Sequence, residues 1–130
     1  MIKFGYTILY VSDVEKSMSF YEKAFGLKRK FISPGNVYGE LDTGNTTLSF
    51  AEIEFAKSNL KGDVVAADLG KPPFAIEIGF TTVDVKKAYE EAIAAGARPE
   101  AHPQRKPHGQ TVAYIRDLEG FLVEICTPMA

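Results

Sequence analysis

The stretch Thr111-Val-Ala-Tyr-Ile-Arg-Asp-Leu-Glu-Gly-Phe-Leu-Val-Glu-Ile-Cys-Thr127 decides the fold class. Its β-branched and aromatic residues flank a turn at residues 117–120, a pattern that predicts two strands joined by a hairpin. Alternation along the second strand places Leu122, Glu124 and Cys126 on one face, so a carboxylate lies between two apolar neighbours. A buried charge must be paired, protonated or bound to a cation. Glu124 is therefore the first candidate site residue, and a strand glutamate that faces water is the alternative.

The composition is that of an ordinary globular domain. The chain has 130 residues, of which 45% are hydrophobic and 25% charged, enough for one domain with a full core. A net charge of −2 provides no basic surface for nucleic acid, and no apolar run approaches the length of a bilayer span. We therefore expect a cytoplasmic protein without nucleic-acid or membrane partners. The single cysteine, Cys126, excludes an internal disulfide and is expected to be a packed thiol.

The same succession of elements occurs twice along the chain. Residues 6–11 predict a strand, a helix follows between Asp13 and Gly26, and further strands are expected near residues 29–32, 37–42 and 46–52. From residue 74 the order repeats, with a strand, a helix between Asp84 and Gly96, an irregular proline-marked segment expected to hold one more strand, and the closing hairpin. The two pairs of helix-capping residues lie about 70 positions apart, which indicates an internal duplication.

The duplication predicts a single domain of two modules, at about residues 1–56 and 74–130. Between them, residues 57–73 lose the periodic pattern and contain turn-forming Gly and Pro residues. A connection of this length is expected to be a linker or a functional lid.

The duplication also relates four candidate site residues. Tyr6 corresponds to Glu77, and Ser49 corresponds to Glu124. Their neighbours on the same strand faces are mostly small or polar, whereas the opposite faces carry bulky apolar residues. Each sheet is therefore expected to pack its bulky face on a helix and to leave the other face available for a ligand.

Three segments of the chain resemble the signatures of a known superfamily. Residues 10–27 resemble the first-module signature of the vicinal oxygen chelate superfamily, the group of glyoxalase I, bleomycin resistance proteins and extradiol dioxygenases. Residues 77–85 and 113–125 resemble its second-module strand and closing hairpin. The resemblance implies an α+β fold in which two tandem βαβββ modules form a curved mixed sheet with helices on the outer face. This fold hosts many chemistries.

The resemblance also implies where a metal would bind. In the metal enzymes of the superfamily, four sheet positions hold a divalent ion, and these match Tyr6, Ser49, Glu77 and Glu124. Glu124 matches the usual final glutamate, whereas Tyr6 and Glu77 replace histidines and Ser49 is a poor ligand. Two carboxylates suit Mg²⁺ or Mn²⁺ but make a weak Zn²⁺ or Ni²⁺ site. This departure from the usual set of metal ligands resembles the branch of the superfamily whose members bind drugs without a metal ion.

Three residues outside this set are weaker candidates. His108 directly precedes a strand expected to line the cavity and could reach a ligand, although a solvated histidine is the favoured interpretation. Arg116 could bind an anionic substituent, and Tyr114 could stack on an aromatic ligand, although sheet packing explains Tyr114 equally well.

The favoured function is a small-molecule-binding protein that holds an organic ligand, such as an antibiotic or an aromatic compound, without a catalytic metal. The expected ligand contacts are Tyr6, Ser49, Glu77, Tyr114, Glu124, His108 and Arg116. The alternative is a divalent-metal-dependent lyase, isomerase or dioxygenase, with Glu77 and Glu124 as metal ligands and one of them as the general base. By analogy with the drug-binding relatives, we expect a homodimer in which residues 57–73 permit the modules to be exchanged.

Overall fold

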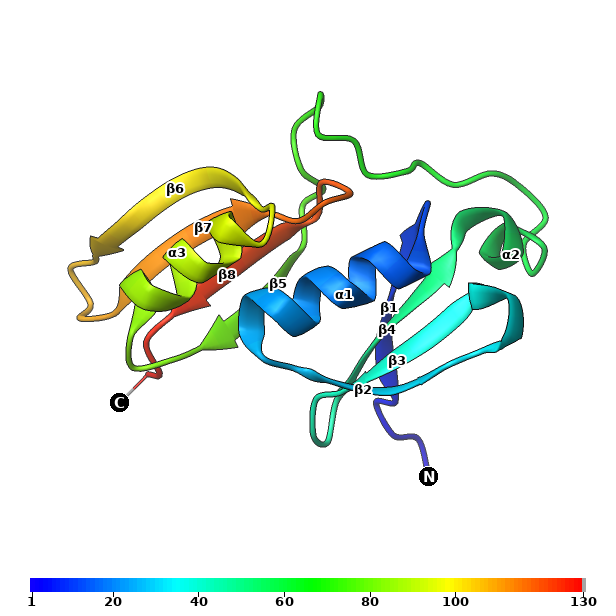
Figure 1. The fold of residues 1–130 in the computed structure, drawn as a ribbon, viewed down its shortest axis with the longest axis horizontal. Coiled ribbons are helices and arrows are strands. Elements are labelled where there is room, and N and C mark those ends of the chain that lie inside the picture. The colour runs from blue at the N-terminus through cyan, green and yellow to red at the C-terminus, as the bar shows by residue number, and fades with distance from the viewer. Residues whose placement is uncertain (130) are drawn as a thin grey trace. The chain divides into compact units, whose positions relative to one another are not determined.

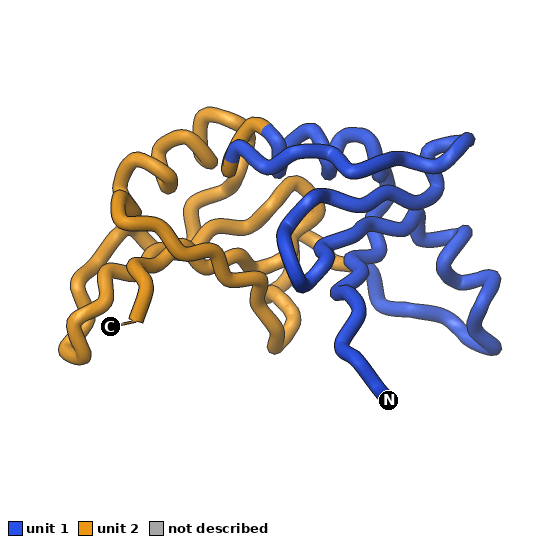
Figure 2. The backbone as a smooth tube through the Cα atoms, turned by 90° about the horizontal axis from the view of Figure 1, so that it is seen from below, with its two compact units in different colours: residues 1–22, 26–66 blue, residues 23–25, 67–130 orange. Residues whose placement is uncertain are grey.

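The structure, a computed structural model, describes residues 1–129 and divides the chain into two compact units (Figure 2). Unit 1 contains residues 1–22 and 26–66, and unit 2 contains residues 23–25 and those from 67 onward. Each unit holds one four-stranded mixed sheet, with the strand orders β1-β4-β3-β2 and β5-β8-β7-β6 (Figure 1). The α+β fold of tandem βαβββ modules is thus confirmed. No helix among the described residues combines the length and apolarity needed to cross a membrane.

Unit 1 follows the predicted order and adds one short helix. Its elements are β1 (Tyr6–Val11), α1 (Val14–Phe25), β2 (Lys28–Ile32), a 3-10 turn (Pro34–Asn36), β3 (Tyr38–Asp42), β4 (Thr47–Glu52) and α2 (Ile53–Lys57). The helix α1 begins where the Asp13 side chain accepts a hydrogen bond from the backbone N–H of Lys16 (3.0 Å), and it ends at Gly26 with φ 68°. Asp and Gly are favoured at these two positions because the first satisfies a free N–H group and the second adopts positive φ without strain.

The core of unit 1 lies between α1 and one face of the sheet. Phe50 on β4 is fully buried, and its ring lies 5.3 Å from that of Tyr21 on α1. Gly39 on β3 faces Met18, whose sulfur occupies the space that a side chain would need. The glycine therefore lets the helix approach the sheet closely.

Unit 2 repeats this arrangement. Its elements are β5 (Glu77–Thr81), α3 (Val85–Ala94), β6 (Arg98–Arg105), β7 (Thr111–Arg116) and β8 (Leu122–Cys126). Asp84 caps α3 by accepting from the backbone N–H of Lys87 (3.1 Å). The helix lies against β6, β7 and β8 (Figure 1). The sheet buries Ile115, Val123 and Ile125 completely, so the opposite face remains open.

One element differs from the sequence-based expectations, the short helix α2, which was not expected at all. The proline-marked segment holds the one further strand that was expected there, β6, and this strand runs through Pro99 and Pro103. Because β6 is an edge strand that pairs with β7 alone, it needs only one row of ladder hydrogen bonds and tolerates Pro99 and Pro103. Its register shifts between Pro99 and Ala101 and again between Ala101 and Gln104.

The last part of the connection is fixed to unit 2 by Arg116. This arginine is 2% exposed, and its Nη2 donates to the backbone carbonyls of Asp68 (3.0 Å) and Lys71 (2.9 Å). Its Nε donates to the carbonyl of Gly120 (2.6 Å). Gly120 has φ 111°, and a Cβ there would lie 3.1 Å from both Arg116 and the backbone of Asp68. A larger residue would therefore push this segment away from the β7–β8 turn.

Candidate functional site

The open face of the unit 2 sheet carries two carboxyl groups on neighbouring strands. Glu124 on β8 is the register partner of Gly79 on β5. Glu77 lies two residues before Gly79 on the same face of β5, and it is therefore a neighbour of Glu124. Tyr114 on β7 is the register partner of Glu124 on its other side. The parallel β5–β8 pair and the antiparallel β7–β8 pair thus bring Glu77, Glu124 and Tyr114 together, and their role as ligand contacts stays a prediction.

Hydrogen bonds at Glu124 favour its ionised form. The hydrogen bond with Glu77 is the largest of the effects that lower the pKa of Glu124, and bonds from the Cys126 thiol and the Tyr114 hydroxyl add to it. The Tyr114 hydroxyl donates to Glu124 Oε1 at 3.0 Å. In turn, the hydrogen bond with Glu124, burial and charge repulsion raise the pKa of Glu77 to about 7. The carboxyl pair therefore shares one proton near neutral pH, as expected for two carboxyl groups in one site.

The two other donors stay protonated. Burial is the main cause that raises the pKa of the Tyr114 hydroxyl to about 12 and that of the Cys126 thiol to about 11, and the hydrogen bond to Glu124 adds to both. Cys126 is a packed thiol, as expected, but it is also a hydrogen-bond donor within the site. The signal that could have revealed this role was its position two residues after Glu124 on the same strand face.

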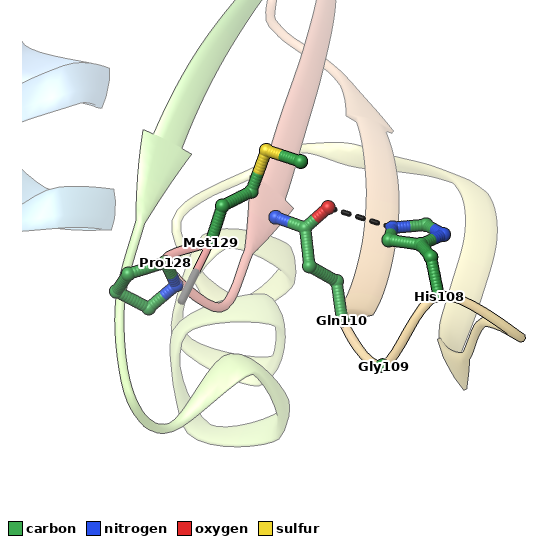
Figure 3. Close-up of a pocket in the computed structure, with 5 residues that line it drawn as sticks. All are labelled: His108, Gly109, Gln110, Pro128 and Met129. Carbon is green, nitrogen blue, oxygen red and sulfur yellow. Dashed lines mark hydrogen bonds between the residues drawn. The ribbon is translucent and has the colours of Figure 1, made fainter.

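A pocket of about 270 Å³ lies where the β6–β7 hairpin meets the residues that follow β8 (Figure 3). It is lined by His108, Gly109, Gln110, Pro128 and Met129. A backbone carbonyl can only accept, so the atom of Gln110 that binds the carbonyl of Thr127 (2.7 Å) is the amide Nε2. The other amide atom, Gln110 Oε1, then faces His108 Nε2 at 2.7 Å. His108 therefore donates from Nε2 to Gln110 Oε1.

One residue of the pocket, His108, lies within electrostatic range of Glu124. The pKa of Glu124 is lowered first by Glu77 and, to a smaller extent, by the charge of His108. His108 is exposed, in keeping with the favoured interpretation, and it is also a wall of the pocket. Of the predicted ligand contacts, His108 is the one that lines this pocket.

The remaining predicted residues have other surroundings. Tyr6 and Ser49 belong to unit 1, where Tyr6 is 56% exposed and Ser49 is fully buried and donates to the carbonyl of Thr7 (3.3 Å). Arg116, which the sequence suggested for an anionic ligand, directs its guanidinium to backbone carbonyls of the connection and the β7–β8 turn. We assign Arg116 a structural role for this reason.

The donor set does not fit a zinc or nickel centre. Among residues 1–129 the structure contains no group of three or more His, Cys, Asp and Glu side chains arranged to hold a metal ion. The Ser49 hydroxyl is turned to a backbone carbonyl, and the two carboxyl groups bind each other. Such centres normally need three or four nitrogen, sulfur or carboxylate ligands, so we derive no chemical step through a metal ion.

A repeated βαβββ unit with polar groups on an open sheet face defines a class of ligand-binding and catalytic proteins. The model of the Glyoxalase/Bleomycin resistance protein/Dioxygenase superfamily matches residues 3–125, and the chain belongs to this superfamily. No curated protein sequence matches the chain.

Several solved structures share the fold. A glyoxalase-related enzyme from Fulvimarina pelagi has 19% identity and a TM-score of 0.84, with 98% of this chain and 89% of that chain covered. A hypothetical protein from S. aureus has 24% identity and a TM-score of 0.78, with 98% and 95% covered. Lactoylglutathione lyase from Agrobacterium tumefaciens has 21% identity and a TM-score of 0.71, with 98% and 94% covered. At these identities the similarity establishes the fold alone, and any activity has to be argued from the residues of the site.

Replacement of Glu77 by Gln is expected to flatten the pH dependence of thermal stability. The pKa of Glu77 rises from an ordinary value of 4.5 to about 7 in the folded protein. Protonated Glu77 therefore contributes its full stabilisation at a pH below the pKa of the unfolded state, and this contribution is lost as the pH rises through the pKa of the folded state.

Scanning calorimetry across this range should show the Tm of the wild type falling relative to that of Glu77→Gln. Glu90→Gln, at an exposed position of α3, is the control and should follow the wild type. Parallel curves for Glu77→Gln and the wild type would contradict the shared proton.

Proposed function

We propose that this protein binds a small organic ligand on the open face of unit 2 and does so without a catalytic metal ion. The observation that carries the proposal is the carboxyl pair Glu77–Glu124, which shares one proton and is flanked by the Tyr114 hydroxyl. A ligand amine or other N–H group can replace the shared proton and donate to both carboxyl groups at once. Charge-assisted hydrogen bonds of this kind are among the strongest available to a ligand.

The surroundings of the pair suit an organic ligand better than a metal ion. The Tyr114 ring offers an aromatic surface beside Glu124, and the pocket at His108 can take a further part of the ligand. An antibiotic or another aromatic compound would match these features. The lyase, isomerase or dioxygenase alternative needs a divalent ion, and the donor chemistry described above argues against a tight site for one.

The replacement Glu124→Gln is expected to weaken ligand binding by roughly 10- to 100-fold, because it removes a charged acceptor. The probes are a library of aromatic amines and antibiotics, screened by thermal shift and followed by calorimetry on each compound that binds. Glu90→Gln is the matched control on α3 and should leave the affinities unchanged.

Two results would contradict the proposal. One is a set of bound compounds whose affinities do not change in Glu124→Gln. The other is stoichiometric, tight binding of Mn²⁺, Ni²⁺ or Zn²⁺ that Glu124→Gln abolishes, because it would make Glu77 and Glu124 metal ligands. That second result would establish the metal-dependent enzyme instead.

The proposal includes a cytoplasmic homodimer in which the modules are exchanged between protomers. Arg116 holds Asp68 and Lys71 within unit 2, and residues up to 66 belong to unit 1, so a hinge for the exchange would lie near the boundary at residues 66–67. Sedimentation equilibrium provides the test, and a monomer at all micromolar concentrations would remove this part of the proposal.

A further inference from the structure

The strand β6 forms an exposed edge of the unit 2 sheet. It pairs with β7 alone, and every one of its residues except Pro103 is exposed. An edge strand presents a row of unpaired N–H and C=O groups on its free side, and a second chain can pair with that row. The features that alter this side of β6 therefore decide whether another copy of the chain can extend the sheet.

Two bulges interrupt β6. Ala101 and Gln104 are three positions apart, whereas their register partners on β7, Tyr114 and Val112, are two positions apart. A second shift of the same kind lies between Pro99 and Ala101. An extra residue bends a strand and increases its twist, so a regular strand from another chain cannot follow the free side of β6.

Two prolines remove hydrogen-bond donors from the same side. A proline has no N–H group, so in an edge strand its nitrogen takes a position that faces away from the neighbouring strand. Pro99 is the register partner of Ile115, and Pro103 lies inside the bulge between Ala101 and Gln104. The free side of β6 therefore carries a proline ring, in place of a donor, at both positions.

A hydrogen bond to α3 holds the second bulge in place. His102 lies within this bulge, and its Nδ1 is hydrogen-bonded to the hydroxyl of Tyr89 on α3 at 3.1 Å. The two rings pack edge to face with their centroids 5.7 Å apart, and Tyr89 is 6% exposed. A buried tyrosine hydroxyl needs a partner, so straightening the bulge would cost this hydrogen bond.

The opposite edge of the sheet, β5, has none of these features. It pairs with β8 in unbroken register from Glu77 to Thr81, and it contains no proline. The bulges and the prolines are thus confined to one of the two edges of this sheet.

We infer that β6 is an edge closed to strand addition, because a proline-containing bulge, held to α3 by the Tyr89–His102 hydrogen bond, prevents a second copy of the chain from pairing with it. A second copy is the relevant partner, since each copy carries the same edge and two identical edges can meet around a two-fold axis. The inference does not depend on the proposed homodimer, which would have to form through another surface.

The test is the double variant Pro99→Thr/Pro103→Thr, which restores both N–H groups with a residue that favours strands. Sedimentation velocity should show a further association step, to twice the mass of the wild-type species. Amide hydrogen exchange at residues 98–105 should become at least about tenfold slower as the protein concentration rises. Pro72→Thr makes the same change at an exposed position of the connection and should behave as the wild type does.

Two further variants locate the effect. Ala101→Lys, added to the double variant, should abolish the new association, because like charges on two facing edges repel each other. Tyr89→Phe in the wild-type chain keeps the packed ring but removes the hydroxyl. It should speed exchange at residues 101–104 and leave exchange in the centre of β8 unchanged.

Three results would overturn the inference. They are a double variant with the mass of the wild type at every concentration, an association that Ala101→Lys does not reverse, and unchanged exchange at residues 101–104 in Tyr89→Phe. If circular dichroism shows that the double variant does not fold, Pro103→Thr, which changes the second bulge alone, takes its place with the same expectations. Ligand binding should be the same in all these variants, so failure of this inference leaves the proposed function standing.

Discussion

Replacement of Arg116 by Leu is expected to lower the free energy of unfolding by about 3 to 5 kcal/mol. The guanidinium is 2% exposed and donates to the carbonyls of Asp68, Lys71 and Gly120. Leucine fills much of the volume but leaves these acceptors without their charged donor, and a buried polar group without a partner is costly. Urea unfolding at fixed pH, with the midpoint and slope both recorded, measures the loss.

Two further variants separate the hydrogen bonds of Arg116 from a general effect of removing charge. Arg105→Leu makes the same change at an exposed position of β6 and should cost less than about 1 kcal/mol. Gly120→Ala keeps the arginine but introduces a Cβ at 3.1 Å from it, at a position with φ 111°, and should increase hydrogen exchange at residues 68–71. If Arg116→Leu costs no more than Arg105→Leu, Arg116 has no structural role and returns to the list of candidate ligand contacts.

Phe50→Ala is expected to destabilise unit 1 by about 3 to 5 kcal/mol, because it leaves a cavity in the core. Phe50 is fully buried on β4, and its ring packs 5.3 Å from that of Tyr21 on α1. Urea unfolding followed by circular dichroism measures this loss. A separate, earlier transition of unit 1 would show that the two units unfold independently.

The matched control for Phe50 is Phe55→Ala on α2. Phe55 belongs to the same unit but is 44% exposed, so its loss should cost less than about 1 kcal/mol. Similar losses for the two variants would contradict the assignment of Phe50 to the core.

Local signals in the sequence were enough to predict most of the fold. Asp13 and Gly26 delimit α1 because their roles depend only on the adjacent backbone, and Asp84 does the same for α3. The strand β6 was harder to predict because Pro99 and Pro103 argue against a strand. Only its position at the edge of the sheet makes them acceptable, and that position depends on the tertiary fold.

The candidate site likewise contains residues that local sequence signals predict and residues whose role depends on the tertiary fold. Alternation along β8 and the internal duplication predicted Glu124 and Glu77, and the structure places them in one hydrogen-bonded pair. The role of Arg116 was not predictable, because its acceptors include residues 45 to 48 positions away in a segment without periodicity.

Ser49 and Glu124 occupy corresponding places in the two sheets, opposite Ile8 in one and Gly79 in the other. The two halves therefore share a backbone plan but differ in chemistry at this place, which holds a fully buried hydroxyl in unit 1 and a carboxylate in unit 2. Because the core-forming side chains point the opposite way along each strand, substitutions on an open face leave the packing of its helix untouched. A gene duplication of this kind yields two surfaces that can diverge in specificity while both halves remain folded.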